Sequence, residues 1–360
     1  MPIGPAQVRT PAPRRAPLRL GYVPLIHAAP LFAAAELGLF RARGLEVRLC
    51  RELGWATIRD KILSGELEAA QALGPMPLAL TLGIGSVRCP ALTALVLNVH
   101  GNALIVARRL WMAGLHEDVP LAQLARRREE PLTFAIVHAH SSHAFLLKRW
   151  LGHQGLAEGR DFRLVVVPPS QMVHHLRAGH VDGGCVGEPW GTLAVQAGVG
   201  VIIALSAELA PDHPEKVLVV REVFAESRHA EHLALVAALR EACAWCAVPA
   251  NRPALLDLLA DRAGLEVPRA ALEPVLTGDY DLGACRRAHQ PEAIIFNGDD
   301  VNEPGLRHAR WIAGCLDTPE AAAATLLQRT FRADLYRDAL SLPVSSRHSQ
   351  PAPTLETHLS

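Results

Sequence analysis

The sequence has no excess of charge of either sign. Its 360 residues include 36 basic and 36 acidic side chains, so the formal net charge is zero. A surface that holds nucleic acid or an anionic membrane needs a basic excess, and this balance argues against both as general partners. No apolar run is long enough to span a bilayer, so we predict no transmembrane segment.

Cysteine is also scarce, and no export signal is recognisable. Seven scattered cysteines are too few for a disulfide framework, and an odd count fits a reducing compartment. The start of the chain is rich in Pro, Ala and Arg but lacks the apolar segment of a signal peptide. We therefore expect a cytoplasmic protein, with disordered tails at residues 1–17 and 343–360.

Half of the residues are hydrophobic, which is enough for a sizeable core in two domains or lobes. A strand is expected at "LRLGYVP" (18–24) and a helix at "PLFAAAELGLF" (30–40), ending near Gly38. The segment "LTFAIVHAHSSHAFLLKRWLG" (132–152) repeats this order of strand, polar loop, helix and glycine.

The spacing of the repeat is constant. The same 114 positions separate three pairs of landmarks: Gly38 and Gly152, Gly65 and Gly179, Pro75 and Pro189. This spacing predicts two units of βαβ type with one architecture. Strands that alternate with helices predict an α/β protein in which mostly parallel sheets are flanked by helices.

Two short segments end the central strands of the predicted lobes. They are "QALGPMP" (71–77), which begins with Gln71, and "GCVGEPW" (184–190), which contains Glu188. Ligands of open α/β sheets lie beyond the carboxyl ends of the strands. Both segments are therefore expected to line a cleft between the lobes.

Polar residues also follow the first strand of each unit. His27 follows the first strand, and "HAHSSH" (138–143), with Ser141 and His143, follows its counterpart. The latter group lies just before a helix N-terminus, which favours an anion, although Ser141 or Ser142 could equally serve as the N-cap. The H-x-H-x-x-H spacing matches no standard zinc pattern, so we expect no metal.

Four further residues are candidates for contact with an anion. Trp55 precedes a helix and could offer its indole N–H or pack in the core. Gly101-Asn102 interrupts a strand, as a close backbone approach or a tight turn would, and the Asn102 amide can donate two hydrogen bonds. Lys216 lies near a crossing between the lobes, as a counter-charge or as a surface lysine.

No motif of a known class of catalyst is present. The chain lacks a G-x-S-x-G elbow, a P-loop and a G-x-G-x-x-G loop. Glu188 and Glu215 are the acids near the expected cleft, and the spacing ties no second carboxylate to Glu188. We therefore expect a binding protein that is not an enzyme and has no cofactor.

Several uncommon motifs resemble one family in order and spacing. They are "GWATIRDKI", "ALGPMPLAL", "LNVHGNALIV", "VVVPPSQMVHHLRAGHVDGGCVGEPW" and "HPEK", and the likeness covers roughly residues 18–315. The family is that of the nitrate- and bicarbonate-binding proteins of ABC transporters. The sequence looks more like its cytoplasmic nitrate/nitrite sensor branch (NasS-like), because Asn102 stands where transport proteins tend to have Gln.

The resemblance implies a fold and a site. The fold is a two-lobed type II periplasmic-binding-protein architecture with the ligand cleft between lobes, lobe 1 at 18–106 and 218–342 and lobe 2 at 107–217. The ligand-binding positions that it implies are Trp55, Gly101, Asn102, His143 and Lys216. Additional cleft residues are His27, Gln71, Ser141, Gln171 and Glu188.

The resemblance also implies a ligand and a partner. The expected ligand is nitrate or nitrite, and the expected partner is an ANTAR-domain RNA-binding antiterminator of nitrate assimilation. Three alternatives stay open: the solute-binding component of a nitrate or bicarbonate ABC transporter, an enzyme like the thiamine-pyrimidine synthases, and a sulfonate-binding protein of the same fold. The sequence has no cysteine-rich run of the kind that the enzyme group carries.

Overall fold

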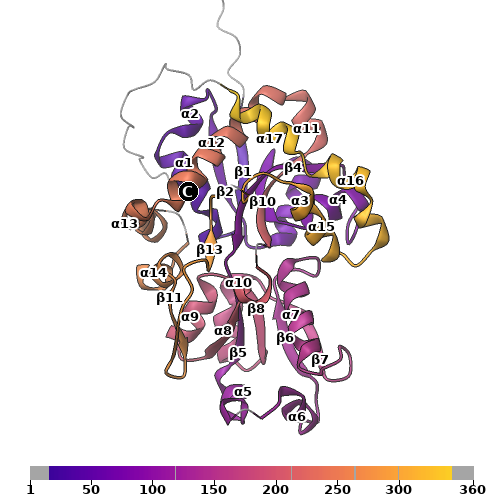
Figure 1. Cartoon of the computed structure of the whole chain (residues 1–360), viewed down its shortest axis with the longest axis vertical. Coiled ribbons are helices and arrows are strands. Elements are labelled where there is room, and N and C mark those ends of the chain that lie inside the picture. Colours follow the sequence, from indigo (N-terminus) through magenta and orange to yellow (C-terminus); the bar gives the residue numbers. More distant parts are fainter. Residues whose placement is uncertain (1–15, 118, 212, 263–264, 299, 343–360) are drawn as a thin grey trace, which may run out of the picture.

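The computed structural model describes residues 16–117, 119–211, 213–262, 265–298 and 300–342. The expected tails at 1–17 and 343–360 lie outside the described residues, apart from residues 16 and 17. The described residues form two lobes that follow each other along the long axis of the molecule (Figure 1). Each lobe is built on one sheet with helices around it, as the α/β prediction required. The prediction of mostly parallel sheets was wrong, because within the described residues the two sheets contain four parallel and five antiparallel strand pairs.

The first lobe contains a six-stranded sheet of order β13-β4-β10-β3-β1-β2. β1 pairs in parallel with β2 and β3, whereas β10 runs antiparallel to β3 and β4. The bounds of these strands are β1 Leu18–Tyr22, β2 Val47–Arg51, β3 Ala69–Leu73, β4 Ala91–His100, β10 Pro214–Arg221 and β13 Ile294–Ile295.

The second lobe contains a five-stranded sheet of order β7-β6-β8-β5-β9. β6 pairs in parallel with β7 and β8, and β5 runs antiparallel to β8 and β9. The bounds are β5 Asn102–Ala107, β6 Leu132–Ile136, β7 Phe162–Val166, β8 Gly183–Gly187 and β9 Gly200–Leu205. A separate pair, β11 Asp279–Gly283 and β12 Arg286–His289, lies against this lobe, where Arg286 donates to the Ile202 carbonyl at 3.0 Å.

The predicted repeat is confirmed by the order of the strands. β2-β1-β3-β10 in the first sheet corresponds to β7-β6-β8-β5 in the second, and β1 and β6 begin 114 positions apart, as do β3 and β8. Gly65 and Gly179 follow equivalent helices with φ of 78° and 76°. One landmark was wrong: Gly152 lies inside a helix, and Gly155 (φ 75°) makes the turn three residues later.

The chain crosses between the two sheets twice. The first crossing is at His100 and Gly101, whose φ angles are 61° and 97°, and the second is at His213. β5 was predicted in lobe 1 and the first residues of β10 in lobe 2, but their backbone hydrogen bonds place each in the other sheet. Apolar strand patterns do not say which sheet a strand joins. We propose 102–212 as lobe 2, with 18–101 and 213–342 as lobe 1.

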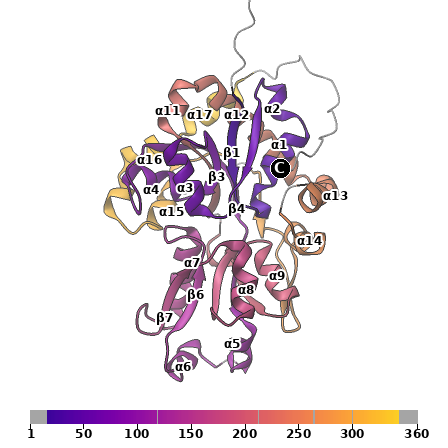
Figure 2. The same cartoon turned by 180° about the vertical axis from the view of Figure 1, so that it is seen from behind.

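Helices cover both sheets, with α1, α2 and α12 on one flank of the first lobe and α3, α4, α15 and α16 on the other (Figure 2). Within the described residues no single helix has the length and apolar character to cross a membrane; α12 passes with Pro249–Ala260 only as a pair bent by 88°. The helices of the first lobe are α1 Ala29–Glu36, α2 Leu39–Ala42, α3 Trp55–Ser64, α4 Met76–Leu82, α11 Glu222–Ser227, α12 His229–Ala247, α13 Arg252–Asp257, α14 Arg269–Thr277, α15 Leu306–Gly314, α16 Ala324–Thr330 and α17 Ala333–Leu340. Those of the second lobe are α5 Arg108–Met112, α6 Leu121–Arg126, α7 Ser142–His153, α8 Met172–Arg177, α9 Trp190–Gln196 and α10 Ser206–Leu209.

Short 3₁₀ helices complete the connections: η1 Ile26–Ala28, η2 Leu115–Glu117, η3 Pro169–Gln171, η4 Pro249–Asn251 and η6 Pro319–Ala322. The segment η5 Leu258–Arg262 is a π-helix. Small residues in β8 let its neighbours approach closely. A Cβ at Gly183 would lie 2.5 Å from the Ile105 carbonyl oxygen, and one at Gly184 would lie 2.5 Å from the Ala135 carbonyl oxygen. All seven cysteines are free, as expected from their number and spacing.

Candidate functional site

Polar side chains from both lobes meet where the two sheets come together. His27 from η1, Trp55 from the start of α3 and Lys216 from β10 belong to the first sheet's side, and Asn102 from β5 and His143 from α7 belong to the second. Each of the five is at most 1% exposed. The Lys216 Nζ lies 5.3 Å from the centroid of the Trp55 ring, a distance at which the cation and the aromatic face attract each other.

Several polar atoms in this region have no hydrogen-bond partner among the described residues. They are Trp55 Nε1, His143 Nε2, Gln71 Nε2, both ring nitrogens of His27, and the side-chain amide atoms Asn102 Nδ2 and Oδ1. A buried polar atom without a partner costs about 1–3 kcal/mol. Their concentration where two lobes meet therefore indicates a site for a small polar ligand.

A β-bulge shapes the centre of this site. The pairing of β10 with β4 shifts register between Pro214 and Val217, so two consecutive side chains, Glu215 and Lys216, come together. The Lys216 Nζ donates to Glu215 Oε1 at 2.5 Å, and both residues are fully buried. Bulges of this kind often re-aim side chains next to functional sites.

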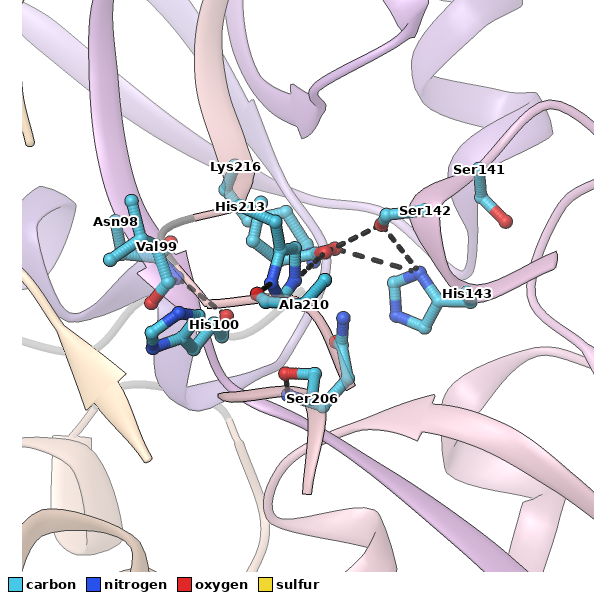
Figure 3. Close-up of polar contacts among 12 residues, drawn as sticks. Asn98, Val99, His100, Ser141, Ser142, His143, Ser206, Ala210, His213 and Lys216 are labelled. Atoms are coloured by element: carbon cyan, nitrogen blue, oxygen red, sulfur yellow. Dashed lines mark hydrogen bonds and ion pairs between the residues drawn. The ribbon is translucent and has the colours of Figure 1, made fainter. Parts of the chain in front are cut away.

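Glu215 is contacted from both lobes, and Figure 3 labels its partners Ser142, His143, His213 and Lys216. The Ser142 hydroxyl donates to Oε2 at 2.5 Å, His143 Nδ1 lies 3.5 Å from Oε1, and His213 Nε2 lies 3.3 Å from Oε2. Glu215 was expected near the cleft, but it was not among the predicted ligand-binding residues. The adjacent Glu and Lys in "HPEK" could have indicated a role for Glu215, because an acid and a base on a central strand cannot both reach solvent.

The electrostatics of the site follow from its burial. Burial raises the pKa of the Glu215 carboxyl, but Lys216, His143 and His213 outweigh this and hold it well below its usual range. Burial lowers the pKa of His143 to about 3 and that of His27 well below its usual value. Both imidazoles are therefore neutral near pH 7, each with one donor and one acceptor nitrogen.

Gly101 lies directly beside His27. A Cβ added at Gly101 would collide with the His27 imidazole, so the backbone reaches this ring only because residue 101 has no side chain. The Gly101 carbonyl accepts from the Glu188 N–H at 2.9 Å, and the Glu188 carbonyl accepts from the Ile26 N–H at 3.1 Å. The first crossing is thus tied to the ends of β1 and β8.

The remaining cleft candidates are placed differently. Ser141 caps α7, because its Oγ accepts from the Ala144 N–H at 3.1 Å, and the neighbouring Ser142 reaches the site instead. Gln71 accepts from the Val23 N–H at 3.1 Å and is buried. Gln171 is exposed and is not among the buried residues of the site. The start of α7 could be recognised in the sequence, but the sequence did not show whether Ser141 or Ser142 caps this helix.

Glu188 is buried at the end of β8 and has a structural contact. Its Oε2 accepts from the Thr192 N–H at 3.0 Å, whereas Oε1 has no hydrogen-bond partner among the described residues. Burial raises the pKa of this carboxyl to about 7. The Glu188 carboxylate connects β8 to α9. Burial raises the pKa of Tyr280, and the negative charge of Glu188 raises it further.

Sequence reasoning missed two further contacts of the site. The Ser206 Oγ accepts from the Asn102 N–H at 3.1 Å and so fixes the start of β5. The His213 ring packs against the rings of both His100 and Trp311, with a centroid distance of 5.1 Å to each. Among the described residues no group of three or more His, Cys, Asp or Glu side chains is arranged to hold a metal ion.

Comparison with known proteins gives consistent matches. Residues 11–260 match the NMT1-like family. The chain is 37% identical over 335 residues to the nitrate import ATP-binding protein NrtC of Synechocystis sp. (strain ATCC 27184 / PCC 6803 / Kazusa), covering 89% of this chain and 49% of the relative. It is 38% identical over 300 residues to the bicarbonate transport ATP-binding protein CmpC of the same organism, covering 82% of this chain and 44% of the relative.

The chain therefore spans about half the length of these two relatives. Among solved structures it resembles the periplasmic nitrate-binding protein NrtA from Synechocystis PCC 6803, with a TM-score of 0.84 and 26% identity, covering 93% of this chain and 91% of NrtA. This match confirms the predicted two-lobed periplasmic-binding fold. The solved relative is a binding protein, which confirms the prediction of a binding protein rather than an enzyme.

Proposed function

The chain belongs to the NMT1-like family, and we propose that this protein binds a small planar oxyanion, nitrate or nitrite, between its two lobes. The observation that supports this most is the convergence of Lys216 with the unpartnered polar atoms of Trp55, Asn102 and His143. Nitrate is singly charged and flat, so it needs one cation and several donors around its plane. A charged hydrogen bond in such a site contributes about 1.5–3 kcal/mol.

Each candidate residue has a distinct part in this proposal. Lys216 provides the positive charge, and Trp55, Asn102 and His143 provide N–H donors from three directions. Gly101 lends backbone to the site and, because it has no side chain, lets the His27 ring pack directly against the first crossing. The name of the solved relative NrtA, a nitrate-binding protein, supports the same ligand.

The biological role that we propose is that of a cytoplasmic nitrate/nitrite sensor. Closure of the lobes on the anion would release an RNA-binding antiterminator of nitrate assimilation that holds the unliganded form. A ligand shifts such an equilibrium only by its difference in affinity for the two states, and the partner must weaken anion binding by the same factor. The resemblance at Asn102 to the sensor branch supports this role.

A second candidate is the oxyanion-binding part of a nitrate or bicarbonate transporter. The specific observation in its favour is the identity of 37% and 38% to NrtC and CmpC, over about half of each. In this role the partner would be a transporter component, and the anion would act on transport rather than on RNA.

The ligand is tested by isothermal titration calorimetry of the full chain with nitrate, nitrite, bicarbonate and a short alkanesulfonate. We expect nitrate and nitrite to bind without a divalent cation, because Lys216 and neutral donors form the site. Each titration is repeated with calcium and with chelator. Bicarbonate binding that depends on calcium, together with no response to nitrate, would show that the ligand is wrong.

The partner is tested by affinity capture of the unliganded chain from a nitrate-free lysate. We expect an ANTAR-domain RNA-binding protein in the captured complex and its release by millimolar nitrate, because the closed form no longer holds it. A Lys216→Met variant serves as the control and should keep the complex in the presence of nitrate. Capture of a transporter component instead would favour the second candidate.

A further inference from the structure

Glu215 places a fixed negative charge inside the proposed anion site. Its Oε1 accepts from Lys216 Nζ at 2.5 Å and lies 3.5 Å from His143 Nδ1. Its Oε2 accepts from the Ser142 hydroxyl at 2.5 Å and lies 3.3 Å from His213 Nε2. Both oxygens are therefore held by side chains from the two lobes, and the carboxylate keeps its place beside Lys216.

The contacts fit an ionised carboxylate. The Lys216 ammonium can only donate, and the Ser142 hydroxyl donates its hydrogen to Oε2, so both oxygens act as acceptors. Burial raises the pKa of Glu215, but Lys216 and His143 hold it well below its usual range. The side chain is fully buried, so water and salt screen its charge much less than they screen a surface charge.

An anion bound to Lys216 lies close to this charge. The ammonium group has three hydrogens, and one of them is directed to Glu215. A charged hydrogen bond from Nζ is about 2.7–2.9 Å long, so the bound oxygen lies within about 5.4 Å of Glu215 Oε1. With an effective dielectric constant between about 20 and 40, one negative charge at that distance weakens the binding of a monoanion roughly 10- to 100-fold.

We propose that Glu215 restricts the site to monoanions. This inference rests on the proposed oxyanion site. The cost of dehydrating an ion rises with the square of its charge, whereas the attraction of Lys216 only doubles from a monoanion to a dianion. Because Glu215 offsets much of that attraction, the site repays the dehydration of a weakly hydrated monoanion such as nitrate but not that of a dianion.

The test is the nitrate affinity of Glu215→Gln, measured by calorimetry. Glutamine has nearly the same shape and keeps an acceptor for Ser142, but it carries no charge. We expect nitrate to bind roughly 10- to 100-fold more tightly, because the repulsion is removed. If Glu215 only held the site together, the same change would weaken binding, so an equal or lower affinity overturns the inference.

A matched pair of ligands separates charge from shape. Chlorate and sulfite have the same number of electrons and the same pyramidal shape, but chlorate has one negative charge and sulfite, at mildly alkaline pH, has two. We expect the unsubstituted protein to bind chlorate at least about 100-fold more tightly than sulfite. In Glu215→Gln this preference should fall by roughly 10- to 100-fold, because the dianion loses twice the repulsion.

Two further variants are the controls. Ser142→Ala removes a contact of Glu215 without changing any charge, so the preference for chlorate over sulfite should stay. Glu68→Gln removes a carboxylate that is paired with Arg19 away from the cluster, and it should keep both the nitrate affinity and the preference.

The outcomes separate the two proposals. Sulfite that binds the unsubstituted protein within about tenfold of nitrate overturns the role of Glu215 and leaves the proposed function standing, and this measurement needs no variant to fold. Chlorate that binds as weakly as sulfite assigns the exclusion to shape, and a preference that is unchanged in folded Glu215→Gln assigns it to other residues; each overturns the inference. Failure to bind nitrate or nitrite at all overturns the proposed function, and this inference with it.

Discussion

Replacement of Lys216 by methionine is expected to lower nitrate affinity by about 30- to 1,000-fold, or ~2–4 kcal/mol. Methionine keeps most of the side-chain volume but removes the counter-charge of the anion. The same change leaves Glu215 buried without its cation, and breaking a buried pair costs roughly 3–5 kcal/mol of unfolding free energy. Calorimetry measures the first effect and urea unfolding the second.

A double variant separates the two consequences. Glu215→Gln combined with Lys216→Met removes both charges, so most of the lost stability should return while nitrate affinity stays low. Glu68→Gln, which breaks the pair with Arg19 away from the cluster, is a control for removing a carboxylate and should leave affinity unchanged. Nitrate affinity within about threefold of the original in Lys216→Met would contradict the role of Lys216 as the counter-charge.

Gly101→Ala is expected to abolish measurable nitrate binding and to lower the unfolding free energy by about 2–5 kcal/mol. The φ of 97° is unfavourable for alanine, and the new Cβ would collide with the His27 ring. The collision forces either the first crossing or His27 to move, and both are next to the proposed anion contacts. Calorimetry and urea unfolding of the purified variant measure the two effects.

Gly179→Ala is the matched control for this substitution. Gly179 also has a positive φ, 76°, but open space surrounds the position of its Cβ. It should therefore show the backbone cost alone, about 1–2 kcal/mol, and keep its nitrate affinity. If Gly101→Ala loses no more than this control and still binds nitrate, the close approach at Gly101 has no part in the site.

The sequence allowed the repeated architecture to be predicted because constant spacing is a property of the chain itself. β1 and β6 begin 114 positions apart, as do β3 and β8, which is the separation of the paired glycines and prolines in the sequence. The sheet membership of β5 and β10 could not be predicted in the same way, since buried apolar runs such as residues 103–107 and 217–220 fit either sheet. That choice is made by hydrogen bonds to strands distant in sequence.

Candidate site residues could be proposed from the sequence where a single residue stood out against its neighbours. Trp55, Gly101, Asn102 and Lys216 each interrupt a pattern that the surrounding residues establish, whereas Ser206 and His213 do not. The roles of the latter two, and of Glu215, arise from contacts over long separations, such as 73 positions from Ser142 to Glu215 and 104 from Asn102 to Ser206. No local pattern contains that information.

The two crossings between the sheets lie beside each other and beside the polar cluster. The His100 N–H donates to the His213 carbonyl at 3.3 Å, so the two connections between the sheets are joined at one point. The anion that we propose would lie near this point, close to the axis of a rotation that bends both connections. With so short a lever arm, a displacement of a fraction of an ångström at the anion becomes a much larger one at the distal ends of the lobes, near α6 and α11 (Figure 1).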